Sequence, residues 1–161
     1  MPELRHLVTG DVEKLRQLLR ACWLDTYTGI LPDSVIQTAL TVWQGKESVL
    51  RGLQNPQAFY SGYFEDEELV GMVSAGKIDA NTLKIFQLYV LPSHQRKGIG
   101  SKLMDAAIKH FEGAGKVVLE VEDGNQKGIS FYSKYGFTYA SKTVVKIGGE
   151  EIPCLLGELH L

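Results

Sequence analysis

One short segment of the chain gathers the residue types that bind phosphate groups in proteins. It runs from Leu88 to Ser101 and carries the basic pair Arg96-Lys97, followed by Gly98-Ile99-Gly100. The first N–H groups of a helix have no internal partner, and the aligned peptide dipoles place about half a positive charge there. Glycines leave those N–H groups open to an anion. The segment therefore predicts an anion site at a helix start, although glycines placed there only for helix packing would give the same pattern.

Two common phosphate motifs do not explain this loop. The spacing is not that of a P-loop, and the dinucleotide fingerprint Gly-x-Gly-x-x-Gly is broken by Leu103. A second group of polar, aromatic and glycine residues follows in segment 119–137. It consists of Leu119-Glu120-Val121, Asn125, Gly128, Phe131-Tyr132 and Gly136-Phe137. The combination of the two segments favours a functional site over a packing role.

The apolar pattern predicts a mixed α/β (α+β) chain that must position these segments. Strands are predicted over residues 3–8, 59–64, 69–78, 83–90, 116–122, 137–147 and 151–159. Helices are predicted over residues 12–22, 33–43, 46–53, 98–110 and 126–135, with an aromatic loop over residues 23–32. Pro92 ends the strand 83–90 because it has no N–H to donate. The helix 98–110 then connects two strands in one βαβ crossover.

Length and composition indicate one ordinary globular domain. The chain has 161 residues, of which 44% are apolar, and its net charge of −2 gives no electrostatic footprint for nucleic acid. No apolar run approaches about eighteen residues, so we expect a cytoplasmic protein without membrane contact. The two cysteines, Cys22 and Cys154, lack metal-ligand spacing, and no metal site is predicted. Cys22 falls on the apolar face of its helix, which favours a core residue over a nucleophile.

The two segments together resemble the signatures of the GNAT superfamily of acetyl-CoA-dependent N-acetyltransferases. Gln95-Arg96-Lys97-Gly98-Ile99-Gly100 matches the family's loop Gln/Arg-x-x-Gly-x-Gly/Ala, after the usual Leu-x-Val-x-Pro strand end. The run from Asn125 to Phe137 matches Asn-x-x-Ala-x-x-Phe-Tyr-x-x-x-Gly-Phe, except that Gly128 replaces the alanine. The resemblance spans the whole chain in the order of its elements.

This resemblance implies the GNAT acyl-CoA N-acyltransferase fold, a central, mostly antiparallel, splayed mixed sheet with about four or five helices. It implies a single GNAT domain over residues 1–161. Within that domain, residues 83–112 would form the pyrophosphate motif and residues 116–137 the second motif. Residues 22–54 would form the helical region on the acceptor side.

The resemblance also implies how acetyl-CoA binds. Backbone N–H groups from Arg96 to Ser101 would hold the pyrophosphate, and the pantetheine would lie between strands 83–90 and 116–122. Main-chain groups of Leu88 and Val90 would pair with the pantetheine, and the Val90 N–H would donate to the thioester carbonyl. The implied cofactor-binding residues are Leu88, Tyr89, Val90, Gln95, Arg96, Lys97, Gly98, Ile99, Gly100, Ser101, Asn125, Gly128, Phe131 and Tyr132.

For catalysis, the resemblance points to Tyr132 as the acid and Glu120 as the base. A phenol, with a reference pKa of about 10, can donate a proton to the departing thiolate. A glutamate in this context, twelve residues before the tyrosine, is proposed as the base in the branch that acetylates protein N-termini. Strand alternation places Glu120 on one face with Val118 and Glu122. Tyr132 could instead be a core aromatic and Glu120 a structural carboxylate, and a water relay could replace the base.

The acceptor amine would meet the helical region, because the two motifs occupy the cofactor side. Trp23, Asp25 and Tyr27 could hold a cation by charge and cation–π attraction, although Trp23 could equally anchor the first helix in the core. The resemblance implies direct transfer, in a ternary complex, from acetyl-CoA to a primary amine. That amine would belong to a small molecule such as a polyamine or amino compound, or to a peptide or protein. A non-catalytic acyl-CoA sensor is the alternative, and a homodimer is compatible with both.

Overall fold

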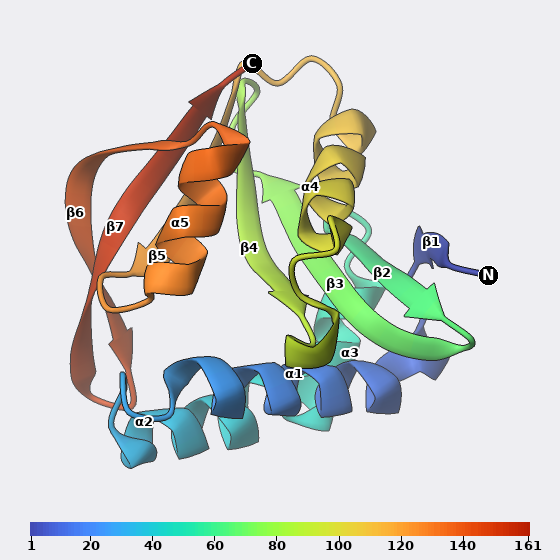
Figure 1. The fold of residues 1–161 in the computed structure, drawn as a ribbon, viewed down its shortest axis with the longest axis horizontal. Coiled ribbons are helices and arrows are strands. Elements are labelled where there is room, and N and C mark those ends of the chain that lie inside the picture. Colours follow the sequence, from blue (N-terminus) through green and yellow to red (C-terminus); the bar gives the residue numbers. More distant parts are fainter.

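The computed structural model describes all residues, 1–161, and centres on one mixed sheet of seven strands (Figure 1). The strands follow the order β1-β2-β3-β4-β5-β7-β6 across the sheet. Their bounds are β1 (Glu3–His6), β2 (Phe59–Glu65), β3 (Glu68–Lys77), β4 (Thr82–Val90), β5 (Lys116–Glu122), β6 (Thr138–Ile147) and β7 (Glu150–His160). Every neighbouring pair is antiparallel except β4–β5, which is parallel. The mostly antiparallel mixed sheet predicted from the sequence is confirmed.

Five α-helices surround the sheet. They are α1 (Val12–Tyr27), α2 (Asp33–Thr38), α3 (Lys46–Gln54), α4 (Ile99–His110) and α5 (Gln126–Tyr135). Shorter helical segments lie at Thr9–Asp11, Ala39–Trp43 and Pro92–His94. In Figure 1, α5 lies to the left and α4 to the right of β4 in front of the sheet, whereas α1 and α2 run along its lower end. None of the helices is both long enough and apolar enough to cross a membrane.

The first helix extends beyond its predicted end. The sequence predicts a loop from Trp23, but α1 continues to Tyr27, so the loop prediction is wrong for these five residues. Trp23 and Tyr27 are four residues apart and share one helix face, and both side chains are buried. Their rings pack with centroids 4.4 Å apart. Burial of two large aromatic rings outweighs the turn preference of the hydroxyl residues around them.

Apolar clusters pack on both faces of the sheet. One cluster joins α4 to the strands through fully buried side chains such as Leu103, and it includes Leu88 and Val90 at its border. Tyr89, between these two residues on β4, packs instead with the clusters that contain α1. Because successive strand residues point to opposite faces, α4 and α1 lie on opposite sides of β4. Cys22 is buried in the α1 cluster, as its core interpretation requires.

The parallel pair β4–β5 holds together at one end only. Thr82–Lys84 pair with Lys116–Val118, and beyond these residues the two strands have no partner across the gap. Each strand stays paired on its other side, β4 with β3 through Val90 and β5 with β7 through Glu122. Figure 1 shows the two strands diverging below their paired end. The sheet is therefore splayed, with an opening between its two faces.

Candidate active site

The glycine loop before α4 forms an open anion cradle. Gly98 has φ +81°, a left-handed conformation that favours glycine, and a Cβ at Gly98 would meet no atom within 4 Å. The first helical bond here is donated by the Lys102 N–H to the Gly98 carbonyl at 3.1 Å. The N–H groups of residues 99–101 precede this bond and stay free for an anion. Lys97 is exposed beside them.

Gly100, the second glycine of the loop, is explained by helix packing. A Cβ at Gly100 would lie 3.0 Å from the Phe131 ring, so this glycine lets α4 and α5 approach each other. The packing explanation that the sequence left open thus applies to Gly100. It does not apply to Gly98, whose surroundings are empty.

The free edge of β4 presents main-chain groups to the gap. The Leu91 N–H donates to the Val70 carbonyl of β3 at 2.9 Å. Since hydrogen-bonded pairs alternate along an antiparallel ladder, Tyr89 is bonded to β3, whereas the N–H groups of Leu88 and Val90 point away from it. The Val90 carbonyl accepts a hydrogen bond from Gln95 Nε2 at 3.1 Å, which ties the loop to the strand end.

Asn125 and Gly128 build the start of α5. The Asn125 side chain accepts a hydrogen bond from the Gly128 N–H at 3.0 Å, and this contact caps the helix. A Cβ at Gly128 would lie 2.8 Å from Asn125 Nδ2 and 3.2 Å from a Val121 methyl group. The departure from alanine at Gly128 therefore gives the buried Asn125 side chain its room.

Tyr132 of α5 packs against the same core cluster as Leu88 and Val90 of β4. Its ring packs edge-on against Phe131 and Phe137, at centroid distances of 5.3 and 5.7 Å. Burial raises the pKa of Tyr132, and the nearby Tyr89 and Glu122 side chains raise it further. Tyr132 therefore lies near side chains of β4 and β5, the two strands that separate. The hydroxyl makes no hydrogen bond within the protein, and the core and acid interpretations of Tyr132 are physically compatible.

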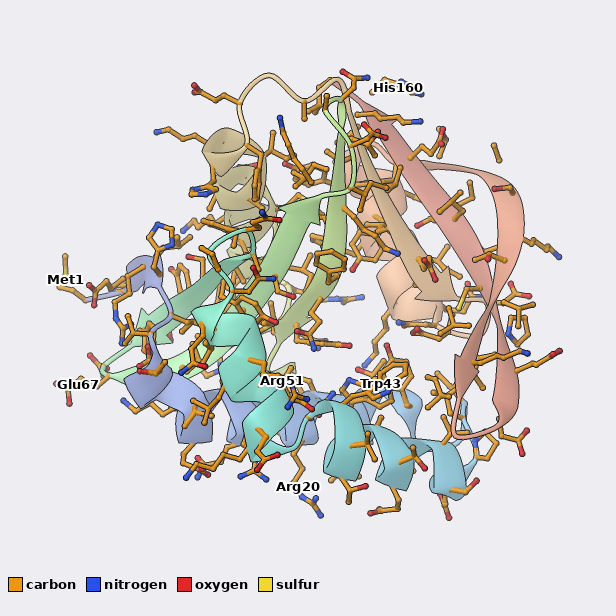
Figure 2. The ribbon with its side chains drawn as sticks, turned by 180° about the vertical axis from the view of Figure 1, so that it is seen from behind. Met1, Arg20, Trp43, Arg51, Glu67 and His160 are labelled. Carbon is orange, nitrogen blue, oxygen red and sulfur yellow. The ribbon has the colours of Figure 1, made fainter.

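A cavity of about 220 Å³ opens on the α1 side of the gap. Five aromatic rings line it, those of Trp23, Tyr27, Trp43, Phe86 and Tyr89. The Trp23 Nε1–H donates to the Tyr89 hydroxyl at 3.0 Å, which links α1 to β4 across the cavity wall. In Figure 2, which shows the molecule from behind, Trp43 lies at the lower end of the gap between β4 and β5.

Two glutamates of β5 face the same cavity in different surroundings. Glu120 accepts a hydrogen bond from Lys84 Nζ at 2.8 Å, so its charge is balanced by a cation. Glu122 takes part in no ion pair, and burial raises the pKa of its carboxyl group. Hydrogen bonding by Tyr27 and Asn125 opposes that rise, while the charge of Glu120 adds to it. The cavity thus combines aromatic faces with net negative charge, a combination suited to an organic cation.

The family model of the Acetyltransferase (GNAT) family matches residues 12–137. The chain belongs to this family. As a GNAT acetyltransferase it is an acyltransferase enzyme, the first of the two functions that the sequence left open. Acetyl-CoA is the acetyl donor of this family, and the open, basic cradle at Gly98 fits a pyrophosphate group.

Similar proteins include a spermidine N(1)-acetyltransferase of Thermoplasma acidophilum, 33% identical over 141 residues, which are 84% of this chain and 87% of the relative. Among solved structures, the PaiA N-acetyltransferase of Thermoplasma acidophilum in complex with coenzyme A has a TM-score of 0.87 and 28% identity. That alignment covers 100% of this chain and 99% of PaiA. A GCN5-related N-acetyltransferase from Rhodopseudomonas palustris, with TM-score 0.84 and 19% identity, covers 100% of this chain and 96% of its own, and shares the fold.

The structure places most of the predicted site residues of this GNAT enzyme around the gap between β4 and β5. Leu88 and Val90 border the α4 cluster together with Tyr132, the glycine loop begins α4, and Trp23 and Tyr27 line the aromatic cavity. Asp25 is not brought there, because its side chain is exposed on α1 and does not line the cavity.

Sequence reasoning missed most of the cavity lining, including Trp43, Gln44 and Glu122. Glu122 could have been found, since strand alternation already placed it on the face of Glu120. Gln44 is buried, and its Oε1 atom has no hydrogen-bond partner. The cavity wall therefore contains one amide oxygen that can accept a hydrogen bond. No pattern in the sequence marks Trp43 or Gln44, because both reach the cavity through the packing of residues 39–44 against the strands.

Proposed function

We propose that this GNAT enzyme acetylates a primary amine of a small linear polyamine such as spermidine. The cavity carries the proposal: it joins the aromatic rings to the two glutamates directly beside the β4–β5 gap. A polyamine carries several ammonium groups on a slender apolar chain, which suits both parts of this lining. The relative that is 33% identical and named spermidine N(1)-acetyltransferase supports the same substrate class.

On the cofactor side, we assign the pyrophosphate to the N–H groups from Arg96 to Ser101. The left-handed Gly98 and the free helix start support this assignment. The N–H groups of Leu88 and Val90 would pair with the pantetheine along the free edge of β4. Bound acetyl-CoA supplies the activated thioester, and the Val90 N–H would polarise its carbonyl.

On the acceptor side, we assign the ring faces of Trp23 and Tyr27 to the aliphatic chain and its ammonium groups. Glu120 would bind an ammonium group of the substrate while it keeps its ion pair with Lys84. Trp43, whose side chain is 48% exposed, would close the outer end of the cavity. These three aromatic residues fall within residues 22–54, which supports the acceptor role proposed for that region.

Tyr132 is assigned as the acid. A tyrosine with a raised pKa keeps its proton at neutral pH, as a donor to a departing thiolate must. Its hydroxyl has no competing partner in the protein, so the proton is available at the gap.

The proposal is tested by incubating the enzyme with acetyl-CoA and an amine panel and measuring thiol release and product mass. The panel holds spermidine, a monoamine of similar length, amino acids, an aminoglycoside and a peptide. Spermidine should give the highest kcat/KM, at least about tenfold above the monoamine, since the second ammonium adds a charge contact. Higher kcat/KM for the peptide or the aminoglycoside would overturn the polyamine assignment and keep the acetyltransferase.

A further inference from the structure

We propose that Glu122, and not Glu120, takes the proton from the acceptor ammonium. The inference rests on the proposed acetylation of an amine in the cavity beside β5. Both glutamates line that cavity, and two residues separate them on one strand face. Position, charge partners and surroundings distinguish them.

Position favours Glu122. The strands β4 and β5 run parallel and separate after the pair Lys84–Val118. Glu120 lies two residues past this last pair and Glu122 four, so Glu122 is about 7 Å further toward the open end. The Val90 N–H, which would polarise the thioester, also lies at the open end of β4. Glu122 is therefore nearer to the level at which the acetyl group would sit.

Charge partners separate the two carboxylates further. The Lys84 ammonium lies 2.8 Å from Glu120, and protonation of Glu120 would leave a half-buried lysine without its counter-charge. Glu122 has no cationic partner, so a proton on its carboxylate leaves no charge unpaired. Glu120 is suited to hold a cation permanently, and Glu122 to exchange a proton.

The groups that face Glu122 allow this exchange. They are Tyr27 of α1, Tyr89 of β4, Tyr132 of α5, Cys154 of β7 and Glu120 of its own strand. Burial raises the pKa of Cys154 to about 12, and it raises the pKa of all three tyrosines, so none of these four is ionised at neutral pH. Burial also moves the pKa of Glu122 upward, toward neutral pH, where a general base works best.

The proton balance of the reaction is then complete. Glu122 accepts one proton from the substrate ammonium, and the freed nitrogen lone pair forms the C–N bond to the acetyl carbon. The C–S bond breaks, the sulfur leaves with the electron pair, and it takes the Tyr132 proton. The second proton of the attacking nitrogen returns to Tyr132. Amide and free thiol are formed, and Glu122 releases one proton to solvent.

The test compares Glu122→Gln with Glu120→Gln, a matched pair on the same strand face. Glu122→Gln should lower kcat/KM about 100-fold and remove the acidic inflection of the kcat/KM profile against pH. Glu120→Gln should keep that inflection and raise KM for the amine. Glu122→Asp, which retains a carboxylate, should restore the inflection at a lower rate. An inflection lost in Glu120→Gln but kept in Glu122→Gln would overturn the assignment.

A second readout needs neither acetyl-CoA nor an amine. ¹³C NMR of the glutamate carboxyl carbons should show one resonance whose pKa is higher than that of the other glutamates and that is absent from Glu122→Gln. An ordinary titration of Glu122 would overturn the inference. Failure of the polyamine proposal would look different, since the wild-type enzyme would then acetylate another amine of the panel, and the pH profiles would be compared on that amine.

Discussion

The gap between β4 and β5 opens on both faces of the sheet, and its two mouths are built in opposite ways. The mouth proposed for the cofactor combines main-chain N–H groups of residues 88–101 with side chains of residues 125–137. The mouth proposed for the acceptor consists of side chains from α1, the helical segment Ala39–Trp43, β4, β5 and the β6–β7 hairpin. One mouth depends on backbone conformation near two glycines, and the other on how distant elements pack.

This difference explains what each mouth can recognise. Free N–H groups at a helix start bind any suitably shaped anion, and they tolerate most side-chain changes around them. The acceptor cavity depends on ring faces and carboxylates whose positions change with each packing contact. The substrate must therefore be inferred from the cavity, since fold alone does not select it.

The largest effect is expected at the cofactor mouth. Gly98→Glu places a carboxylate beside the bound pyrophosphate and forces a non-glycine residue to φ +81°. Affinity for coenzyme A, measured by calorimetry, should fall at least about 100-fold, or 2.7 kcal/mol. Gly113→Glu is the control, because Gly113 has φ +93° and open space at the far end of α4. Unchanged coenzyme A affinity in Gly98→Glu would remove the loop from the site.

Between the two mouths, Tyr132→Phe keeps the ring and removes the proton donor. We expect kcat to fall about 100-fold while coenzyme A affinity stays within about twofold. Tyr135→Phe on the same helix is the control, since the Tyr135 hydroxyl donates to Asp105 on the surface of α4. Equal kcat values for the two variants would argue that Tyr132 is only a core aromatic.

At the acceptor mouth, Glu120→Gln and Asp25→Asn remove one negative charge each. Glu120 lines the cavity and Asp25 does not, so the KM for spermidine should rise about tenfold in the first variant and less than about twofold in the second. Steady-state kinetics with saturating acetyl-CoA measures both values. A larger rise for Asp25→Asn would restore the sequence prediction and place the acceptor outside the cavity.

The smallest effect concerns stability and has an unusual sign. Burial raises the pKa of Glu122 in the folded protein above its unfolded value, so folding favours the protonated acid. Stability linked to Glu122 is therefore lost as the pH rises from the unfolded to the folded pKa. Glu122→Gln should raise Tm at pH 8 and match the wild-type Tm near pH 4. A lower Tm of this variant at pH 8 would show that the ionised carboxylate stabilises the fold.

Several parts of this architecture could be predicted from local sequence. Pro92 ends β4 because it lacks an N–H group, and Gly98 begins α4 because its left-handed φ favours glycine. The two segments that surround the gap match family signatures for the same local reasons. Other features depend on contacts between elements that are far apart in the sequence. The helix end at Tyr27 was missed because the Trp23 and Tyr27 rings gain their burial from α2 and the β6–β7 hairpin.

The sequence by itself determined the strand order of the crossover, the anion cradle and the family, because these depend on residues close together in the chain. Only the tertiary structure decided that Gly100 makes room for Phe131 and that Asp25 stays outside the aromatic cavity. It also gave the two glutamates of β5 different partners. Glu120 and Glu122 are equivalent in the strand pattern, and they differ because Lys84 pairs with Glu120, whereas Glu122 has tyrosine neighbours and no ion-pair partner.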